Sequence, residues 1–361
     1  MNRNSEVVII GAGIMGASLA YFLSKEGKKV LVLEQGEIGG GTSCSTAAWL
    51  WFSDKRPEFY GKLAKKSMEL YRVLEKELDA DCEITFNGSL DFAHNEEELE
   101  GLRQLHAYCL SMGYDARMLS REELHLIEPA LSTELIGGCL VPTDGHVNPF
   151  LLVNAYIQAA KRLGAEICTR TKVTNFVLEG NCITKLITDR GEITPGLVIC
   201  ATGIYSRDIG AKLGLDAHVL PERGFCIVTE KLPPILHYVS TSARQTKSGN
   251  IVFGFVADNV DADFRDRSSR IHGIHRVVQD TVRDYPALKN VGIIRSYTGI
   301  RCKPEDKFPI VGPTVKIENF WFHLSHSAFA VSCALSEAVA EVVAGKRELA
   351  SLSEFLYTRF Y

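Results

Sequence analysis

Several patterns that would direct a functional assignment are missing from this chain of 361 residues. Its ten cysteines include no C-x-x-C pair, and several of them lie in apolar runs that resemble strands. The sequence therefore predicts buried thiols, with no metal site and no iron–sulfur cluster. Basic residues are scattered rather than gathered into a stripe, and the net charge is −4, so we expect no nucleic-acid partner.

Long apolar segments are missing as well. No apolar run reaches the ~18–20 residues that a membrane-spanning helix needs, and the first residues enter a strand-like run without the features of a signal peptide. We expect a cytoplasmic protein with no transmembrane segment, and peripheral attachment to the inner face of a membrane stays open. The length favours two domains over one.

The most informative pattern that is present lies at the start of the chain. An apolar run at residues 7–10 leads into G-x-G-x-x-G at residues 11–16, a helical run, a second apolar run at residues 30–33, and then Glu34. A strand, glycine turn, helix, strand and acid in this order form a complete βαβ dinucleotide-binding unit. The sequence therefore predicts a nucleotide cofactor.

Each residue of this unit has a physical role. Gly11 permits the tight turn, Gly13 lets the backbone approach a diphosphate group, and Gly16 lets the helix lie close to the sheet. Glu34 would accept hydrogen bonds from the ribose hydroxyls and would repel a 2′-phosphate. The unit therefore favours FAD or NAD over NADP.

A second loop of glycines and hydroxyl residues follows at Gly39-Gly40-Gly41-Thr42-Ser43. Its backbone N–H groups and hydroxyls suit phosphate or a flavin ring. A nicotinamide enzyme has no evident need for such a loop here, so the loop shifts the prediction from NAD to FAD.

The rest of the chain predicts an α/β fold, with a Rossmann-type FAD-binding domain and an inserted, mainly antiparallel α+β substrate domain. A buried strand ends in a glycine turn at residues 198–203, and alternating strands at 224–229 and 251–255 precede a helix near 271–284. We assign residues 1–85, 145–220 and 295–361 to the FAD-binding domain, and residues 86–144 and 221–294 to the substrate domain.

These segments, in this order, resemble the D-amino-acid-oxidase-like family of FAD enzymes, in its branch of glycine oxidases, D-amino acid dehydrogenases and proline or opine dehydrogenases. Beyond the opening unit, the matching stretches are Gly39 to Ser43, Asp144-Gly145-His146-Val147, Ala201-Thr202-Gly203, Arg223-Gly224 with Val228-Thr229-Glu230, Gly299-Ile300-Arg301 and Phe308-Pro309-Ile310-Val311-Gly312. The resemblance implies hydride transfer from the carbon beside a substrate amine to flavin N5, which leaves an imine that hydrolyses. No acid–base side chain is strictly required if the amine binds neutral, so we assign no catalytic residue.

The resemblance also implies site residues. Arg301 matches the arginine that holds the substrate carboxylate, and a guanidinium has the shape for two parallel hydrogen bonds to a carboxylate. Trp49 and Tyr297 are the other candidate substrate residues. The candidate cofactor residues are Gly11, Gly13, Ile14, Met15, Gly16, Glu34, Gln35, Gly41, Thr42, Ser43, Thr46, Val173, Ala201, Thr202, Gly203, Arg301, Ser327, Ala328 and Phe329.

Two departures from the family pattern affect the expected function. Residues 325–330 read Ser-His-Ser-Ala-Phe-Ala where the family has a glycine-rich turn, and alanine adopts positive φ less readily than glycine. Residues 242–246 contain no tyrosine where glycine oxidases have a carboxylate-binding one, and they look more like the dehydrogenase subunits. Glycine is therefore a poor substrate candidate.

The leading hypothesis is an FAD-dependent enzyme that oxidises the C–N bond of a small amino acid or secondary amine, with dehydrogenase slightly favoured over oxidase. One alternative is the flavoprotein subunit of a hetero-oligomeric opine, proline or hydroxyproline dehydrogenase. Another is a flavin-binding protein that has lost catalysis. The electron acceptor stays open among oxygen, a quinone and a partner subunit, as does the choice between a homo-oligomer and a hetero-oligomer.

Overall fold

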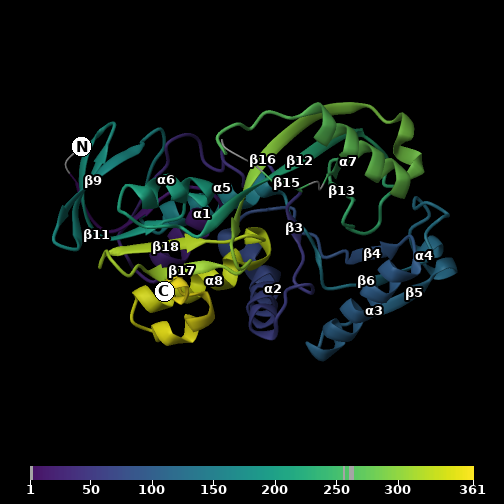
Figure 1. The fold of residues 1–361 in the computed structure, drawn as a ribbon, viewed down its shortest axis with the longest axis horizontal. Helices are drawn as coiled ribbons and strands as arrows, with labels where there is room; N and C mark the ends of the chain where they lie inside the picture. The colour runs from purple at the N-terminus through teal and green to yellow at the C-terminus, as the bar shows by residue number, and fades with distance from the viewer. Residues whose placement is uncertain (1–2, 255–256, 260–263) are drawn as a thin grey trace.

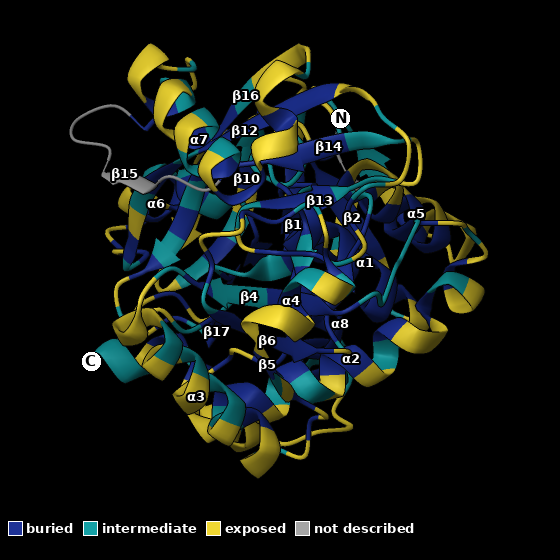
Figure 2. Ribbon diagram, turned by 90° about the vertical axis from the view of Figure 1, so that its right-hand side faces the viewer, coloured by how far each residue is buried: buried dark blue, intermediate teal, exposed yellow. Residues whose placement is uncertain are grey.

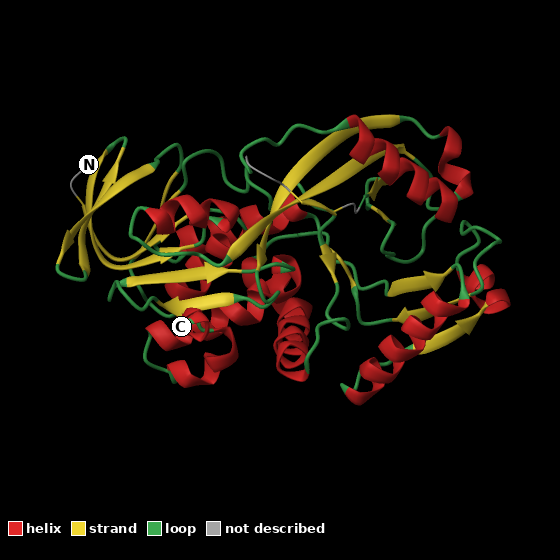
Figure 3. Cartoon of the chain, viewed as in Figure 1, coloured by secondary structure: helices red, strands yellow, loops and turns green. Residues whose placement is uncertain are grey.

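The protein is built around two large β-sheets that meet near the middle of the molecule (Figures 1 and 3). The computed structural model describes residues 3–254, 257–259 and 264–361. Phe255, the last residue of the strand predicted at residues 251–255, lies outside the described part of the chain.

The first sheet has eight strands, with the order β17-β18-β11-β1-β2-β8 and with β10 and β9 added beside β11. Its strands are β1 (Arg3–Ile10), β2 (Val30–Leu33), β8 (Glu166–Cys168), β9 (Val173–Glu179), β10 (Cys182–Thr188), β11 (Gly191–Cys200), β17 (Ile310–Pro313) and β18 (Phe320–Leu324). The central pairs β1–β2, β1–β11, β11–β18 and β2–β8 are parallel. All four residues of β2 are buried, as expected for a parallel strand covered on both faces.

Four helices share one hydrophobic cluster with strands of this sheet, namely α1 (Ile14–Lys25), α2 (Glu58–Leu78), α5 (Pro149–Arg162) and α8 (Ala328–Val343). Helix α6 (Ser206–Ala211) contributes Ile209 to a second cluster, which includes Phe322 of β18. Helix α1 packs against α5 and α8, and α2 packs against α8. Helix α1 is buried from Ile14 to Ser24, because it is apolar around its whole circumference.

The start of α5 shows how local sequence sets a helix boundary. The Asn148 side chain accepts hydrogen bonds from the backbone N–H groups of Phe150 and Leu151, and Pro149 occupies the first turn. Asparagine is a favoured N-cap residue, and proline fits the first turn because its missing N–H is not needed there. These groups together set the start of α5 at Pro149.

The second sheet is antiparallel, with the order β13-β14-β12-β15 and with β16 paired to β12. Its strands are β12 (Val219–Lys231), β13 (Ala243–Gln245), β14 (Asn250–Phe253), β15 (Ala257–Asn259) and β16 (Ile293–Pro304). Helix α7 (Ile271–Asp284) packs on β12. Figure 2 shows that α7 carries exposed residues along its outer side.

A smaller three-stranded sheet extends this part of the molecule. It consists of β4 (Ser89–Ala93), β5 (Arg117–Ser120) and β6 (Gly137–Val141), with α3 (Glu96–Ser111) and α4 (Arg121–Ile127) packed on it. Leu90 and Leu140 of this sheet share one hydrophobic cluster with Phe225 and Ile227 of β12. The two antiparallel sheets therefore enclose a common core. Separately, β3 (Trp49–Leu50) and β7 (Gly145–His146) pair with each other in a short antiparallel ladder.

Short 3-10 helices complete the described chain, namely η1 (Gly203–Tyr205), η2 (Pro286–Asn290), η3 (Leu349–Phe355) and η4 (Tyr357–Phe360). The predicted α/β fold, with a parallel nucleotide-type sheet and antiparallel sheets elsewhere, is confirmed. The exact domain division stays a prediction, and β16 crosses its boundary at residue 295 while pairing with β12. No helix in the described ranges is both long and apolar enough to span a bilayer.

Candidate active site

A cavity of about 1230 Å³ lies where the two large sheets meet. Ile10, Leu33 and Ala201 line it from the carboxyl ends of β1, β2 and β11, and Gly224 and Cys226 of β12 line it from the second sheet. Ligands of open α/β sheets bind at the carboxyl ends of the strands. The volume exceeds the roughly 300–1,000 Å³ of an ordinary ligand pocket, so the cavity has room for a dinucleotide together with a small substrate.

The glycines of the first turn are required by close backbone contacts. Gly11 has φ +103°, and a Cβ atom there would lie 2.7 Å from the carbonyl oxygen of Ala201. A Cβ on Gly16 would lie 2.0 Å from the carbonyl oxygen of Gly11. Gly16 does not line the cavity, so it acts by letting α1 approach the turn.

The second glycine loop lies against the start of α1. The backbone N–H of Ile14 donates to Ser43 Oγ at 2.9 Å, and that of Gly39 donates to the Ala12 carbonyl at 3.0 Å. A Cβ on Gly13 would lie 2.9 Å from Ser43 Oγ. The N-terminus of α1 and the hydroxyl loop therefore form one surface of N–H and O–H groups, which suits an anionic diphosphate group.

Glu34 lies at the end of β2, as the sequence pattern predicts. One carboxylate oxygen accepts the backbone N–H of Ala12 and the other accepts that of Gly36, both at 2.8 Å. Each oxygen has a second lone pair, and the residue lines the cavity. Glu34 therefore holds the turn in shape and can still accept hydrogen bonds from ribose hydroxyls.

Arg301 belongs to a cluster of charged residues on β12 and β16. Glu222 lies directly opposite it in the antiparallel ladder. The Glu222 carboxylate pairs with Arg301 Nη1 at 2.8 Å and with Lys303 Nζ at 2.6 Å, while Arg301 Nη2 contacts His326 Nε2. Burial, together with the neighbouring Arg301 cation, lowers the pKa of His326 to about 3. The histidine is therefore neutral, and the cluster carries a net positive charge.

An aromatic pair lies in the lining of the same cavity. The rings of Trp49 and Trp51 stack with centroids 5.1 Å apart at 30°, and both residues line the cavity. Tyr297 does not line it. Its ring packs with Trp49 around a small apolar cluster, and its hydroxyl donates to the Thr46 carbonyl at 3.3 Å. The structure thus brings Arg301 and Trp49 into the cavity and leaves Tyr297 outside its lining.

The family follows from comparison with known proteins. A family model described as DAO, FAD dependent oxidoreductase, matches residues 6–342. The chain belongs to this family. It is therefore an enzyme, with FAD as its cofactor, and the resemblance stated from the sequence is confirmed.

Individual relatives of this DAO-family chain cover nearly its whole length. It is 30% identical over 337 residues to glycine oxidase of Bacillus subtilis, which covers 90% of this chain and 89% of that protein. A subunit of opine oxidase from Rhizobium meliloti is 26% identical, over 98% of this chain and 97% of that one. The crystal structure of L-proline dehydrogenase from P. horikoshii is similar with a TM-score of 0.92 and 25% identity, over 100% of this chain and 98% of that one.

The residues present fit FAD. Gly13 has no Cβ, and the start of α1 and the hydroxyl loop offer N–H and O–H groups, which suits a diphosphate. The carboxylate of Glu34 suits the hydroxyls of a ribose. Of the candidate cofactor residues named from the sequence, all but Gly16 line the cavity. Their contacts with the cofactor stay predictions.

The turn before α8 departs from the family pattern in sequence, and it still contains one residue with a left-handed backbone conformation. Ser327 has φ +56° and ψ +30° and immediately precedes the helix. Ala328 and Phe329 follow within the helix and line the cavity. The turn needs positive φ at one residue, and a serine supplies it in place of glycine.

Asp54 and Lys55 are cavity residues that the sequence did not reveal. They pair with each other, and both line the cavity near Trp51. Their loop is held by Asp144, which accepts the backbone N–H of Phe52 at 2.9 Å and the hydroxyl of Ser89 at 2.9 Å. Asp144, part of a stretch that carries the family resemblance, therefore anchors this loop. Asp54 and Lys55 themselves lie in no motif.

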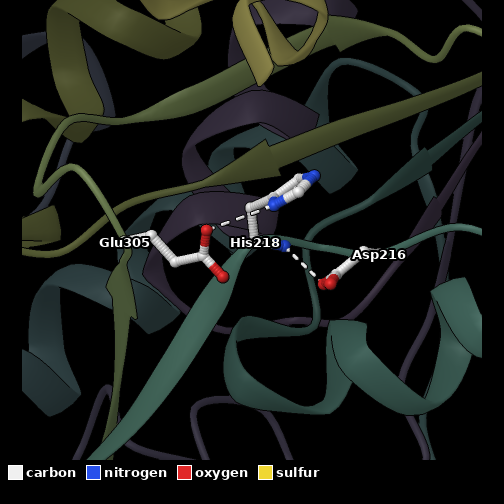
Figure 4. A group of neighbouring side chains, drawn as sticks. All are labelled: Asp216, His218 and Glu305. Carbon is white, nitrogen blue, oxygen red and sulfur yellow. Dashed lines mark hydrogen bonds and ion pairs between the residues drawn. The ribbon is translucent and has the colours of Figure 1, made fainter. Parts of the chain in front are cut away.

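One further group of side chains has metal-like spacing. Ligand atoms of Asp216, His218 and Glu305 all lie within 4.8 Å of one another (Figure 4). His218 Nδ1 lies 3.3 Å from a Glu305 oxygen, and its buried Nε2 has no partner in the described structure. A metal-bound histidine ordinarily donates its other N–H to an acceptor. The arrangement therefore favours a hydrogen bond between His218 and Glu305 over a metal ligand set.

Proposed function

We propose that the protein oxidises the C–N bond of a small amino acid or secondary amine, with dehydrogenase activity slightly favoured over oxidase activity. One observation carries the proposal: a single cavity joins the dinucleotide surface at Glu34 and Ile14 to the cation Arg301 and the aromatic pair. Bound FAD would accept the hydride at N5. The relatives named for glycine oxidase, opine oxidase and L-proline dehydrogenase support an amine-bearing acid as substrate.

Arg301 is the residue proposed to hold the substrate carboxylate. Glu222 and His326 contact its two terminal nitrogens and fix the orientation of the guanidinium. Burial lowers the pKa of Arg301, but the group starts from so high a value that it stays charged at neutral pH. A fixed planar cation binds a carboxylate with less loss of side-chain entropy than a mobile one.

Trp49 and Trp51 are proposed to cover the apolar part of the substrate. Their stacked rings present a flat surface in the cavity lining, which excludes water from the carbon that loses hydride. No general base is assigned, because His326 is already engaged by Arg301 and Ser327. The substrate amine is therefore expected to bind in its neutral form.

Anaerobic visible spectroscopy of the purified holoenzyme tests this proposal. Proline, hydroxyproline, sarcosine and a set of D-amino acids are added in turn, and loss of the flavin band identifies a substrate. Reduction by at least one of these amines is expected. A flavin that none of them reduces, although dithionite does, would overturn the assignment to amino acid or secondary amine oxidation.

A second candidate is the flavoprotein subunit of a hetero-oligomeric dehydrogenase. It is favoured by similarity to the opine oxidase subunit over 98% of this chain and by the lack of a C-x-x-C pair for an iron–sulfur cluster. Expression with the neighbouring genes of its own genome, followed by affinity purification, tests it. A second chain carrying iron or another flavin supports the candidate, and full turnover with an artificial and a natural acceptor by the isolated chain counts against it.

A further inference from the structure

A short segment beside the cavity, residues 264–269, contacts both large sheets, and we refer to it as the strap. At one end, Phe264 packs into the hydrophobic cluster of the eight-stranded sheet, with its ring 5.8 Å from that of Tyr205. At the other end, Ser269 Oγ lies 3.0 Å from Thr298 Oγ1 of β16. The Ser268 carbonyl accepts from Arg223 Nη1 at 2.9 Å. The strap is therefore fixed to both sheets.

Two arginines of the strap line the cavity. Arg265 donates to both carboxylate oxygens of Asp208 at 2.8 and 2.7 Å. Arg267 donates to the carbonyls of Gly40 at 2.8 Å and Gly41 at 3.2 Å, and to Ser45 Oγ at 2.8 Å. The partners of Arg267 in the described structure are thus all neutral, so no carboxylate compensates its charge, in contrast to Arg265.

The surroundings of Arg267 indicate which class of ligand its positive charge would bind. The loop that it contacts also contains Ser43, whose hydroxyl accepts the backbone N–H of Ile14 at the start of α1. The guanidinium therefore lies at the edge of the surface that the helix N-terminus and the hydroxyl loop offer to an anion. A cation with neutral partners next to an anion-binding surface favours a negatively charged ligand.

We propose that Arg267 is a cofactor-binding residue: it supplies positive charge to the diphosphate group of the bound dinucleotide, and the strap that carries it retains the cofactor. The inference depends on FAD as the cofactor and not on which substrate is oxidised. It adds a residue of the strap to a cofactor site whose other polar groups come mainly from the first turn, the hydroxyl loop and Glu34.

The release of FAD from the holoenzyme tests this inference, because flavin fluorescence rises as FAD dissociates and no turnover is needed. R267M is expected to release FAD about tenfold faster, as for loss of one charge-assisted hydrogen bond. Added salt should accelerate release from the wild type and much less from R267M, since screening acts on the charge that the variant lacks. R267K keeps the charge and should retain the salt dependence.

The matched control is R276M, which removes an exposed arginine of α7 that pairs with Asp280 within its own helix. It should release FAD at the wild-type rate. Release from R267M within about twofold of wild type, with an unchanged salt dependence, would overturn the role of Arg267. If R267M does not fold, R267Q replaces it, because glutamine removes the charge and keeps N–H donors for the two carbonyls.

The retaining role of the strap has its own variant. D208N weakens the attachment of Arg265 and leaves Arg267 unchanged, so it should release FAD several-fold faster with the salt dependence of the wild type. Wild-type release from D208N would show that the strap does not retain the cofactor and would overturn that part of the proposal.

Discussion

Replacing Arg301 by methionine should weaken binding of the substrate carboxylate and leave the rest of substrate recognition largely intact. A hydrogen bond to a charged group contributes about 1.5–3 kcal/mol, which corresponds to roughly 10- to 150-fold in the dissociation constant. Glu222 lies 2.8 Å from the guanidinium and offsets part of its charge. We therefore expect the lower end of this range, about 10- to 30-fold.

The assay is the rate of anaerobic flavin reduction as a function of amine concentration, which separates the dissociation constant from the limiting rate. The amine is the one that reduces the flavin of the wild type, and it is compared with its carboxamide, which lacks the anionic charge. R301M should lose binding of the acid and change binding of the amide by less than about threefold. R301K keeps the charge but loses the planar pair of donors, so it should fall between R301M and wild type.

The control is R295M, on the same strand, whose guanidinium lies 5.5 Å from the centroid of the Tyr297 ring and does not line the cavity. It should bind both ligands as the wild type does. If R301M weakened the acid and the amide equally, or neither of them, the assignment of Arg301 to the substrate carboxylate would be refuted.

Three further outcomes are expected from particular residues. S327G should raise the free energy of unfolding, measured in urea, by about 0.5–1 kcal/mol. The reason is that glycine removes the steric cost of the left-handed backbone at Ser327, and this gain exceeds the entropy cost of a glycine. A loss of stability would contradict this. Burial raises the pKa of Asp91 to about 7, so ionising it costs stability as pH rises from about 4 to 7. D91N should therefore be more stable than wild type by up to about 4 kcal/mol at about pH 8 and nearly equal to it at about pH 4. An equal difference at both pH values would refute the cause. G11A should purify with little flavin, because its Cβ would lie 2.7 Å from the Ala201 carbonyl, whereas G101A, with open space at its Cβ, should retain it.

The cofactor half of the site could be predicted from sequence because its constraints are local. Gly16 and Glu34 act within one strand–turn–helix–strand unit, and their spacing alone fixes which groups meet. Gly11 belongs to the same pattern, although the close contact that requires it is with the distant Ala201 carbonyl. The hydroxyl loop was also predictable in composition. Its contact with β16, through the hydrogen bond from Thr42 Oγ1 to the Ile300 carbonyl, spans 258 residues and has no local signal.

The substrate half was less predictable because it depends on long-range register. Glu222 meets Arg301 only because β12 and β16 pair in one particular register, and a shift by one residue would turn the side chain to the other face. Tyr297 lies four residues before Arg301 on the same strand, yet it packs with Trp49 and stays out of the cavity lining. Arg267 lies in an irregular segment, where no periodicity marks a function.

The contact between the hydroxyl loop and β16 has a consequence for how the two halves of the site respond to substitution. Thr42 is hydrogen-bonded to Ile300, the residue before Arg301, and a Cβ on Gly299 would lie 2.7 Å from the Ser45 carbonyl. The loop that lies against the start of α1 therefore also braces the strand that carries Arg301. The proposed cofactor surface and the proposed substrate cation share one mechanical unit, so that a substitution that displaces the loop is expected to displace both together.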